Sequence, residues 1–350
     1  MFKHFSTTLK NFLKPSLQSS NSISTRAMSS FNPLYNHTCL RVKDPQRSIE
    51  YYTQNFGFKL IKTQRIPELK FDLYFLSYND AIDNSPFAVE GVLELTHNYG
   101  TENDADYKIN NGNEEPYRGF GHICLSVDNI VAAEERLLAN GVSFKKKLSD
   151  GRQREIAFAL DPDGYWVELI QHGLGLVEGK TDLASYKFNH AMIRIKDPVK
   201  SLQFYREVLG MKVISTREVP DAKFTLYFLA FDSDAEVAEN SVTRDARAAK
   251  ESVLELTWNW GTEKDESFSY HNGNEQVANA GRNTQGYGHI GISLEDPEGY
   301  CKHLEEKWGD SITWGLKYNQ GKMKGIAFIR DPDNYAIEIL PKFYQFAGLN

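Results

Sequence analysis

The chain carries one long pattern of residues twice, and this tandem repeat limits the folds that it can adopt. The string NHTCLRVKDP at 36–45 returns as NHAMIRIKDP at 189–198. Further strings return in the same order in both halves: LYFLSYND and LYFLAFDSD, VLELTHNYGTEND and VLELTWNWGTEKD, NGNE twice, RGFGHICLSV and QGYGHIGISL, and FALDPDGYWVELI and FIRDPDNYAIEIL. A duplication of this kind predicts two similar structural units in one chain.

The repeat also sets the domain boundaries that we predict. The 350 residues are enough for roughly two domains of ordinary size. We expect an N-terminal presequence or disordered segment, a first repeat, a linker, a second repeat and a C-terminal tail, at 1–30, 31–173, 174–187, 188–342 and 343–350 respectively.

Each repeat divides once more into two units, although the similarity between them is weaker. A His-x-x-Leu-x-Val string begins at His37 and again at His122, and LEL at 93–95 has a counterpart in VEL at 167–169. After the first strand comes a stretch with helical spacing of apolar residues, as in DPQRSIEYYTQNFGF and DNIVAAEERLLANGV. Short β-rich runs separated by turns complete the unit. The sequence therefore predicts a β-α-β-β-β unit four times.

Each of these units offers one His in its first strand and one Glu in its last strand. A Glu within an apolar strand is costly to bury unless it is paired or bound to a metal. A single such Glu is more often exposed to solvent, but four at equivalent positions, each with a strand-borne His, favour two sites of His2Glu2 composition. The candidate ligands are His37, Glu94, His122, Glu168, His190, Glu255, His289 and Glu338.

The residue types narrow the class of metal and of partner. Imidazole and carboxylate together suit Zn, Ni, Co, Mn or Fe(II) rather than Ca or Mg. The three cysteines, Cys39, Cys124 and Cys301, stand at no ligand-like position, which excludes a structural thiolate zinc site, and they fit a reducing compartment. A net charge of −7 argues against a nucleic-acid binder, and no apolar run approaches the length of a membrane helix.

The N-terminal segment differs in composition from the rest. It is basic and rich in Ser, it has helically spaced apolar residues, and no acidic residue precedes Asp44. This pattern is typical of a mitochondrial transit peptide, and a disordered tail is the alternative. A start at Met28 would remove the segment, so we expect a mitochondrial form, a cytosolic form, or both.

The repeated strings closely resemble those of glyoxalase I, the lactoylglutathione lyase family, and in particular its duplicated, two-site monomeric form in fungi. The strings that carry the resemblance are LRVKDP, LELTxN[WY]GTE, GNE, G[FY]GHI and DPD[GN]YxxE[IL], and they cover nearly all of the chain after about residue 31, twice. The resemblance implies an α+β chain with the vicinal-oxygen-chelate (glyoxalase/bleomycin-resistance) fold, built from four βαβββ modules in two tandem repeats.

The resemblance also implies how the ligands combine. In this family a site forms between modules, so a fused chain is expected to have crossed sites. One would contain His37, Glu94, His289 and Glu338, and the other His122, Glu168, His190 and Glu255. The uncrossed combination of His37, Glu94, His122 and Glu168 stays open at this point. Each site would hold one Zn²⁺, with Ni²⁺ or Co²⁺ as alternatives.

The implied reaction detoxifies methylglyoxal. Methylglyoxal and glutathione combine to a hemithioacetal, which the enzyme isomerises to S-D-lactoylglutathione through a metal-stabilised enediolate. By motif, Glu168 and Glu338 are the principal bases, while Glu94 and Glu255 are ligands that handle the opposite stereoisomer of the adduct. These roles agree with general chemistry, because a positioned base supplies about 10²–10⁴ in rate and a metal that acts as a Lewis acid stabilises the enediolate oxygens.

Glutathione is anionic, so arginines on the ligand-bearing faces are candidates for binding it. The family's substrate-binding positions fall on Arg41, Asn98, Arg118, Arg194, Asn259 and Met323. The halves differ here, since Arg118 precedes GFGH in the first half but Gln285 precedes GYGH in the second. We therefore expect two active sites with unequal Michaelis constants, within a monomer that binds neither nucleic acid nor membrane.

Two other functions fit the same fold. One is an Fe(II) extradiol dioxygenase, which would use two His and one carboxylate. The other is a metal-free protein that binds a small molecule in the same cleft. Ligands in all four units and the glutathione-binding positions favour the lyase.

Overall fold

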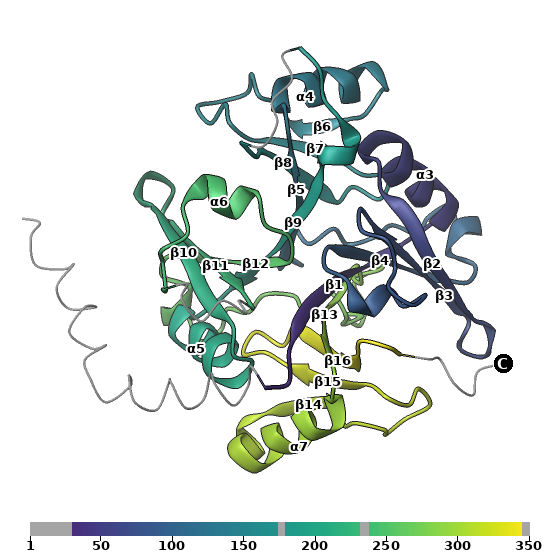
Figure 1. The fold of residues 1–350 in the computed structure, drawn as a ribbon, viewed down its shortest axis with the longest axis vertical. Helices are drawn as coiled ribbons and strands as arrows, with labels where there is room; N and C mark the ends of the chain where they lie inside the picture. The colour runs from purple at the N-terminus through teal and green to yellow at the C-terminus, as the bar shows by residue number, and fades with distance from the viewer. Residues whose placement is uncertain (1–29, 174–178, 232–237, 345–350) are drawn as a thin grey trace, which may run out of the picture.

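Two eight-stranded sheets form the body of the molecule in the computed structural model, which describes residues 30–173, 179–231 and 238–344. The first sheet has the strand order β14-β15-β16-β13-β1-β4-β3-β2 (Figure 1). Its strands are Leu34–Val42 (β1), Lys59–Ile66 (β2), Phe71–Ser77 (β3), Val92–Asn98 (β4), Tyr287–Leu294 (β13), Thr313–Leu316 (β14), Ala327–Arg330 (β15) and Ala336–Pro341 (β16).

The second sheet repeats this plan with the order β10-β11-β12-β9-β5-β8-β7-β6. Its strands are Phe120–Val127 (β5), Phe144–Lys146 (β6), Ala157–Leu160 (β7), Trp166–Gln171 (β8), Lys187–Ile195 (β9), Lys212–Val219 (β10), Phe224–Ala230 (β11) and Val253–Asn259 (β12). The predicted βαβββ units and the vicinal-oxygen-chelate fold class are thus confirmed. The predicted presequence lies, apart from Ser30, outside the described residues.

Each sheet takes one module from each repeat. β1 pairs antiparallel with β13, so the first and last modules share a sheet, and β5 pairs antiparallel with β9, so the two middle modules share the other. Within a module the first and last strands are parallel neighbours, as in β1 with β4 and β5 with β8. The sequence repeats are therefore not the units that form the sheets.

The helices follow the first strand of each module, and their starts are written in the sequence. They are Pro45–Phe56 (α3), Ile130–Ala139 (α4), Pro198–Gln203 (α5) and Pro297–Trp308 (α7), with a short α6 at Arg244–Ala248 between β11 and β12. Asp44 caps α3 by accepting hydrogen bonds from the backbone of Gln46 and Arg47, and Pro45 fits the first helical position. Gly57 ends α3 in the left-handed conformation, with φ of 77°.

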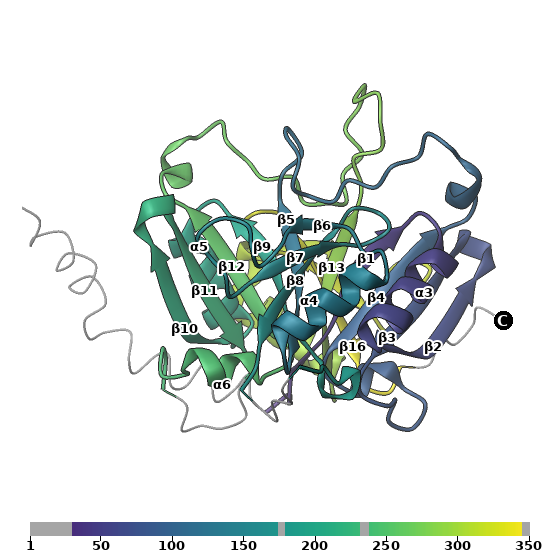
Figure 2. The ribbon, with the colours of Figure 1, turned by 90° about the horizontal axis from the view of Figure 1, so that it is seen from above.

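Helices α3 and α4 lie side by side, which joins the first two modules (Figure 2). Arg136 of α4 donates hydrogen bonds of 2.7 Å to the backbone carbonyls of Gln54 and Asn55. Apolar side chains from both sheets belong to one core cluster, which includes Leu40 and Leu95 from the first sheet. No helix in the described ranges is long and apolar enough to cross a membrane.

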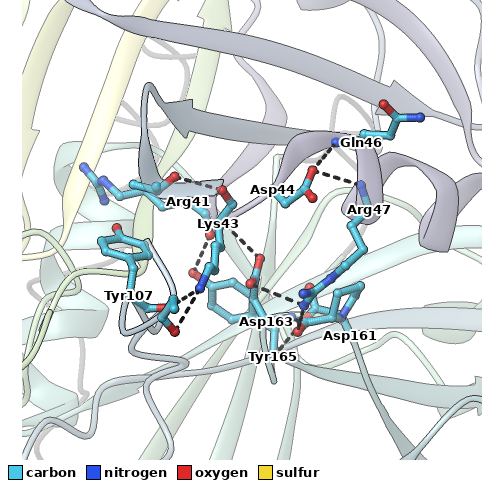
Figure 3. A network of polar contacts seen from close by, with 12 residues as sticks. Arg41, Lys43, Asp44, Gln46, Arg47, Tyr107, Asp161, Asp163 and Tyr165 are labelled. Atoms are coloured by element: carbon cyan, nitrogen blue, oxygen red, sulfur yellow. Dashed lines mark hydrogen bonds and ion pairs between the residues drawn. The ribbon is translucent and has the colours of Figure 1, made fainter. Parts of the chain in front are cut away.

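The Asp-Pro-Asp-Gly-Tyr turn before β8 fastens the second module to the first (Figure 3). Asp163 accepts a hydrogen bond of 3.1 Å from the backbone of Lys43, and the Tyr165 hydroxyl donates to the carbonyl of Arg41 at 3.1 Å. Asp161 is buried and accepts from the Tyr52 hydroxyl at 3.0 Å. Two of these contacts recur before β16, where Asp333 accepts a hydrogen bond of 3.1 Å from the backbone of Lys196 and Asp331 accepts one of 2.9 Å from the Tyr205 hydroxyl. They tie the fourth module to the third.

Candidate metal centres

The first centre lies where four strands of the first sheet bring two imidazoles and two carboxylates together. His37 comes from β1, Glu94 from β4, His289 from β13 and Glu338 from β16, and their ligand atoms all lie within 4.8 Å of one another. The His37 Nε2 atom is 3.4 Å from Glu94 Oε2, 3.3 Å from Glu338 Oε2 and 3.1 Å from His289 Nε2. Three of these residues are buried and His289 is nearly so.

The second centre has the same composition in the second sheet. His122 from β5, Glu168 from β8, His190 from β9 and Glu255 from β12 are all buried. Glu168 Oε2 is 3.3 Å from the Nε2 atoms of both His122 and His190, and Glu255 Oε2 is 3.1 Å from His190 Nε2. Both groups are the crossed combinations, because each contains two ligands from the first repeat and two from the second. The uncrossed combination does not come together.

Asn36 and Asn189, which precede two of the histidines, orient them. Asn36 Oδ1 lies 2.7 Å from His37 Nδ1, and Asn36 Nδ2 donates to the carbonyls of Pro86 and Val89. Because Nδ1 faces an acceptor, it carries the proton, and Nε2 is left for the centre. Asn189 holds His190 in the same way at 2.7 Å. Sequence reasoning missed this role, although the Asn-His pair in both repeats was the signal.

Threonines on the same strands hold two of the four carboxylates. The Thr96 hydroxyl donates to Glu94 Oε1 at 3.1 Å, and Thr257 donates to Glu255 Oε1 at 3.1 Å. The residues two positions after Glu168 and Glu338 are Ile170 and Leu340, which have no hydroxyl. Among these four carboxylates, only Glu94 and Glu255 thus accept a hydrogen bond from a hydroxyl on their own strand.

The electrostatics of both centres fit a divalent cation. Burial raises the pKa of Glu338, but hydrogen bonds from His289 and His37 and the charges of these imidazoles outweigh it and lower that pKa to about 2. Hydrogen bonds to Glu168 and Glu255 overcome the effect of burial on His190 and raise its pKa to about 9. Two buried carboxylates in one group need positive charge nearby, and two neutral imidazoles with a cation satisfy this need.

Each centre opens into its own cavity. A cavity of about 400 Å³ adjoins the first centre and is lined by Arg41, Asn98 and Met323 among the predicted substrate-binding residues. A cavity of about 610 Å³ adjoins the second and is lined by the other three, Arg118, Arg194 and Asn259. Gln285 is not among the residues that line the first cavity.

Hydrogen bonds hold the strand-borne arginines at the edges of these cavities. Arg41 donates to the carbonyl of Tyr287 at 3.1 Å and to Asn274 Oδ1 at 2.9 Å. Arg194 donates to the carbonyl of Phe120 at 2.9 Å and to Asn113 Oδ1 at 2.8 Å. The NGNE loops therefore fix the arginines, which explains why the loop recurs in both repeats.

The arrangement suits a metal-assisted reaction of an anionic molecule. Four ligands surround each position for a cation, carboxylates lie beside it, and a cavity with fixed guanidinium groups leads to it. A bound cation would polarise oxygens of the molecule in the cavity, and a neighbouring carboxylate could move a proton between its carbons.

Comparisons with known proteins agree with this chemistry. The model of the Glyoxalase/Bleomycin resistance protein/Dioxygenase superfamily matches residues 34–169 and 187–339. The chain is 53% identical over 315 residues to glyoxalase I of Saccharomyces cerevisiae, covering 88% of this chain and 92% of the relative. It is 45% identical over 323 residues to lactoylglutathione lyase of Schizosaccharomyces pombe, covering 91% of this chain and 98% of the relative.

A solved structure shows the same architecture. The crystal structure of glyoxalase I from Zea mays superposes with a TM-score of 0.64 at 26% identity, covering 89% of this chain and 92% of the other. The likeness therefore extends over both repeats of the present chain.

Proposed function

The chain belongs to the Glyoxalase/Bleomycin resistance protein/Dioxygenase superfamily and is a lactoylglutathione lyase of the glyoxalase I type, and we propose that both of its centres work on the hemithioacetal of methylglyoxal and glutathione, each with one bound Zn²⁺. The observation that carries this proposal is the pair of buried His2Glu2 groups, each at the base of its own cavity. The same donors accept Ni²⁺ or Co²⁺ in place of Zn²⁺.

The residues of the chain have distinct roles in this proposal. The cation, when bound, supplies Lewis-acid stabilisation of the substrate oxygens. Glu338 in the first centre and Glu168 in the second remove the proton from the carbon that bears the hydroxyl. The same carboxyl returns a proton to the neighbouring carbon, and the hydroxyl proton passes between the two oxygens, so that S-D-lactoylglutathione forms without loss of any atom.

Glu94 and Glu255 are proposed as ligands that stay in place. The hydroxyls of Thr96 and Thr257 anchor them, whereas Glu168 and Glu338 have no threonine at the corresponding position. A carboxylate that must move a proton between two carbons needs freedom to turn toward the substrate. The anchoring therefore supports the division between bases and ligands, and Glu94 and Glu255 would serve as bases only for the opposite stereoisomer of the adduct.

Chelation tests the metal and the reaction together. We expect thioester formation from methylglyoxal and glutathione to stop when a chelator removes the metal, and to return when Zn²⁺ is restored. Metal analysis of the active protein should find two ions per chain. Activity that persists in metal-free protein would contradict the proposal, and so would a metal-loaded protein without activity.

The two sites are proposed to have unequal Michaelis constants. Arg118 lines the second cavity, while its counterpart Gln285 does not line the first. Loss of one charge-assisted hydrogen bond weakens binding by about 1.5–3 kcal/mol. We expect the variant Glu168→Gln, which keeps only the first site, to have a higher KM for the hemithioacetal than Glu338→Gln. Equal KM values in the two variants would contradict this.

We also propose that the chain works as a monomer and that its N-terminus decides its compartment. Each centre is assembled from strands of one chain, which removes the need for a partner subunit. The basic, acid-free composition of residues 1–27 supports import into mitochondria, and a start at Met28 supports a cytosolic form. Sedimentation of the purified protein tests the first point. Fluorescent fusions of the full chain and of the chain from Met28 test the second.

A further inference from the structure

The two centres are alike, but the cavities that lead to them differ in charge and in shape. Two arginines, Arg41 and Arg330, line the first cavity, whereas seven line the second. Aromatic and aliphatic side chains dominate the lining of the first cavity, and Tyr344 is one of them. The two sites therefore offer different surroundings to the same reacting group.

The difference is sharpest beside the histidine that each asparagine holds. Asn36 donates to the carbonyl of Pro86, and Asn189 donates to the carbonyl of Arg247, so these two residues occupy equivalent places. In the first site the next residue is Phe87, whose ring packs edge-on against Phe75 at 5.1 Å and lies 6.0 Å from the His37 ring.

In the second site the guanidinium group of an arginine takes the place of this aromatic ring. Ala248 stands at the position of Phe87 and leaves space, and the Arg247 guanidinium lies over the Phe228 ring, 3.7 Å from its centroid. Phe228 is the counterpart of Phe75, and its ring lies 5.8 Å from that of His190. Among the described residues, the one hydrogen bond of this guanidinium goes to the Ser215 hydroxyl.

The position of Arg247 suits contact with the reacting end of the substrate. The residue lines the same cavity as Glu168 and Glu255 and is within electrostatic reach of both. A bound divalent cation neutralises these two carboxylates, so the charge of Arg247 then acts on whatever fills the space next to the ligands. Phe87 and Phe75 offer only apolar surface at the corresponding place.

Resting on the proposed function, we infer that Arg247 makes the second site select adducts whose aldehyde part carries an anionic group, and that Phe87 makes the first site select apolar aldehyde parts. The ligand class of the second site is thus the glutathione hemithioacetal of a 2-oxoaldehyde with a carboxylate or phosphate substituent. A charge-assisted contact of this kind is expected to favour the anionic substrate by ~10- to 100-fold.

A matched pair of substrates isolates this effect. Phenylglyoxal and 4-carboxyphenylglyoxal differ by one carboxylate at the far end of the ring, and both react with the same glutathione, so the glutathione carboxylates cancel in the comparison. The measured quantity is the ratio of kcat/KM for the carboxylated adduct to kcat/KM for the plain one. Glu338→Gln leaves only the second site and Glu168→Gln leaves only the first.

The second-site enzyme should show a ratio at least about tenfold higher than the first-site enzyme. Arg247→Met in the second-site enzyme should lower this ratio by ~10- to 100-fold, since methionine keeps the apolar stem over Phe228 and removes the charge. Arg206→Met, which loses only a surface ion pair to Glu239, is the matched control and should keep the ratio. Thermal unfolding verifies that each variant is folded.

Equilibrium binding supplies a readout that does not depend on turnover. Calorimetry with S-(4-carboxybenzyl)glutathione and S-benzylglutathione on the zinc-loaded single-site variants should give the same order of preference. Equal ratios at the two sites in both measurements would overturn the inference, and so would an unchanged ratio in Arg247→Met. A failure of both sites to convert the methylglyoxal adduct would instead overturn the proposed function, while the binding comparison would still decide the role of Arg247.

Discussion

At the scale of single residues, the asparagines that precede His37 and His190 position two of the ligands. Each asparagine ties an imidazole to two backbone carbonyls of the loop before the Glu-bearing strand. The side-chain oxygen contacts the imidazole and the side-chain nitrogen binds the loop, so the orientation of the ligand is linked to the position of that loop. Such a partner commonly changes metal affinity by about 10- to 100-fold when it is removed.

Asn36→Ala is expected to weaken metal binding at the first centre by about that factor and to leave the second centre unaffected. The imidazole would lose the acceptor that fixes its tautomer, and the loop at Pro86 would lose a donor. Competition with a chromophoric chelator measures the two affinities separately. Asn103→Ala, which removes an exposed hydrogen bond to Glu102, is the control. Equal affinities in the wild type and Asn36→Ala would contradict the assigned role.

The ligands themselves could be predicted from the sequence because their repetition exposes them. One Glu such as Glu94 in an apolar strand is uninformative, but four in register with four histidines indicate a site. The role of Arg247 could not be predicted in this way, because the segment between β11 and β12 that carries it differs in length and in sequence from its counterpart between β3 and β4. The direction of the Arg247 side chain depends on how α6 packs. A comparison of the two repeats does not predict that packing.

At the scale of elements, the Asp-Pro-Asp turns hold modules together. The sequence predicts a turn at these places, and the motif also marks Glu168 and Glu338. The structure adds that Asp161 is buried and receives hydrogen bonds from the backbone of Asp163 and Tyr165 as well as from Tyr52. This long-range role depends on which strands meet, which a local pattern does not reveal.

The buried turn makes stability depend on pH. Burial, assisted by the charge of Asp163, raises the pKa of Asp161 to about 7, above its ordinary value of 3.8. The folded state therefore binds a proton that the unfolded state has lost, and the free energy of unfolding falls as the pH rises from about 4 to about 7. The limiting slope for one such group is about 1.4 kcal/mol per pH unit.

Asp161→Asn should remove this part of the pH dependence, because the amide keeps an oxygen acceptor but does not ionise. The difference in free energy of unfolding between variant and wild type should move in favour of the variant as the pH rises from 4 to 7. Denaturant unfolding across this range measures it. Asp106→Asn in an exposed loop serves as the control, and parallel curves for Asp161→Asn and wild type would contradict the assignment.

Helix geometry shows another limit of sequence patterns. The segments that follow β1 and β9 have equal length and similar residues, yet α3 runs unbroken to Phe56 while α5 ends at Gln203 and continues as a π-helix over Phe204–Val208. The apolar spacing predicts a helix in both places. This spacing does not distinguish an α-helix, in which each backbone N–H bonds to the carbonyl four residues earlier, from a π-helix, in which it bonds to the carbonyl five residues earlier.

At the scale of the whole molecule, the crossed sheets make the two sites independent of the two repeats. Glu94 and Glu338 are far apart in sequence but share a centre, whereas Glu94 and Glu168 belong to one repeat and to different centres. The effect of two substitutions on activity should therefore depend on whether the residues lie in the same sheet, not on whether they lie in the same repeat. Double variants test this.

Adding Glu94→Gln to Glu338→Gln should cost little further activity, because Glu338→Gln already removes from the first centre both its principal base and a charged metal ligand. Adding Glu168→Gln to Glu338→Gln should abolish thioester formation, since each centre then lacks its principal base and a charged ligand. The kcat per chain of the three variants measures both results. A large loss in the first combination would contradict the crossed arrangement in solution, and activity in the second would contradict the assignment of the bases.

The pairing of β1 with β13 also sets an order for assembly during synthesis. The second sheet, from β5 at Phe120 to β12 at Asn259, is contiguous in sequence and can form while the last module is still being made. β1 cannot pair with β13 until Tyr287 has been made, so a nascent chain exposes one edge of its first module for most of its translation.

Ribosome-bound chains that end before Tyr287 should accordingly be cut by protease in the first module and resist cleavage in the second sheet. Equal resistance of both parts would contradict this order. The crossed arrangement thus places the most exposed part of the growing chain in its first module, where a chaperone has the longest time to bind it.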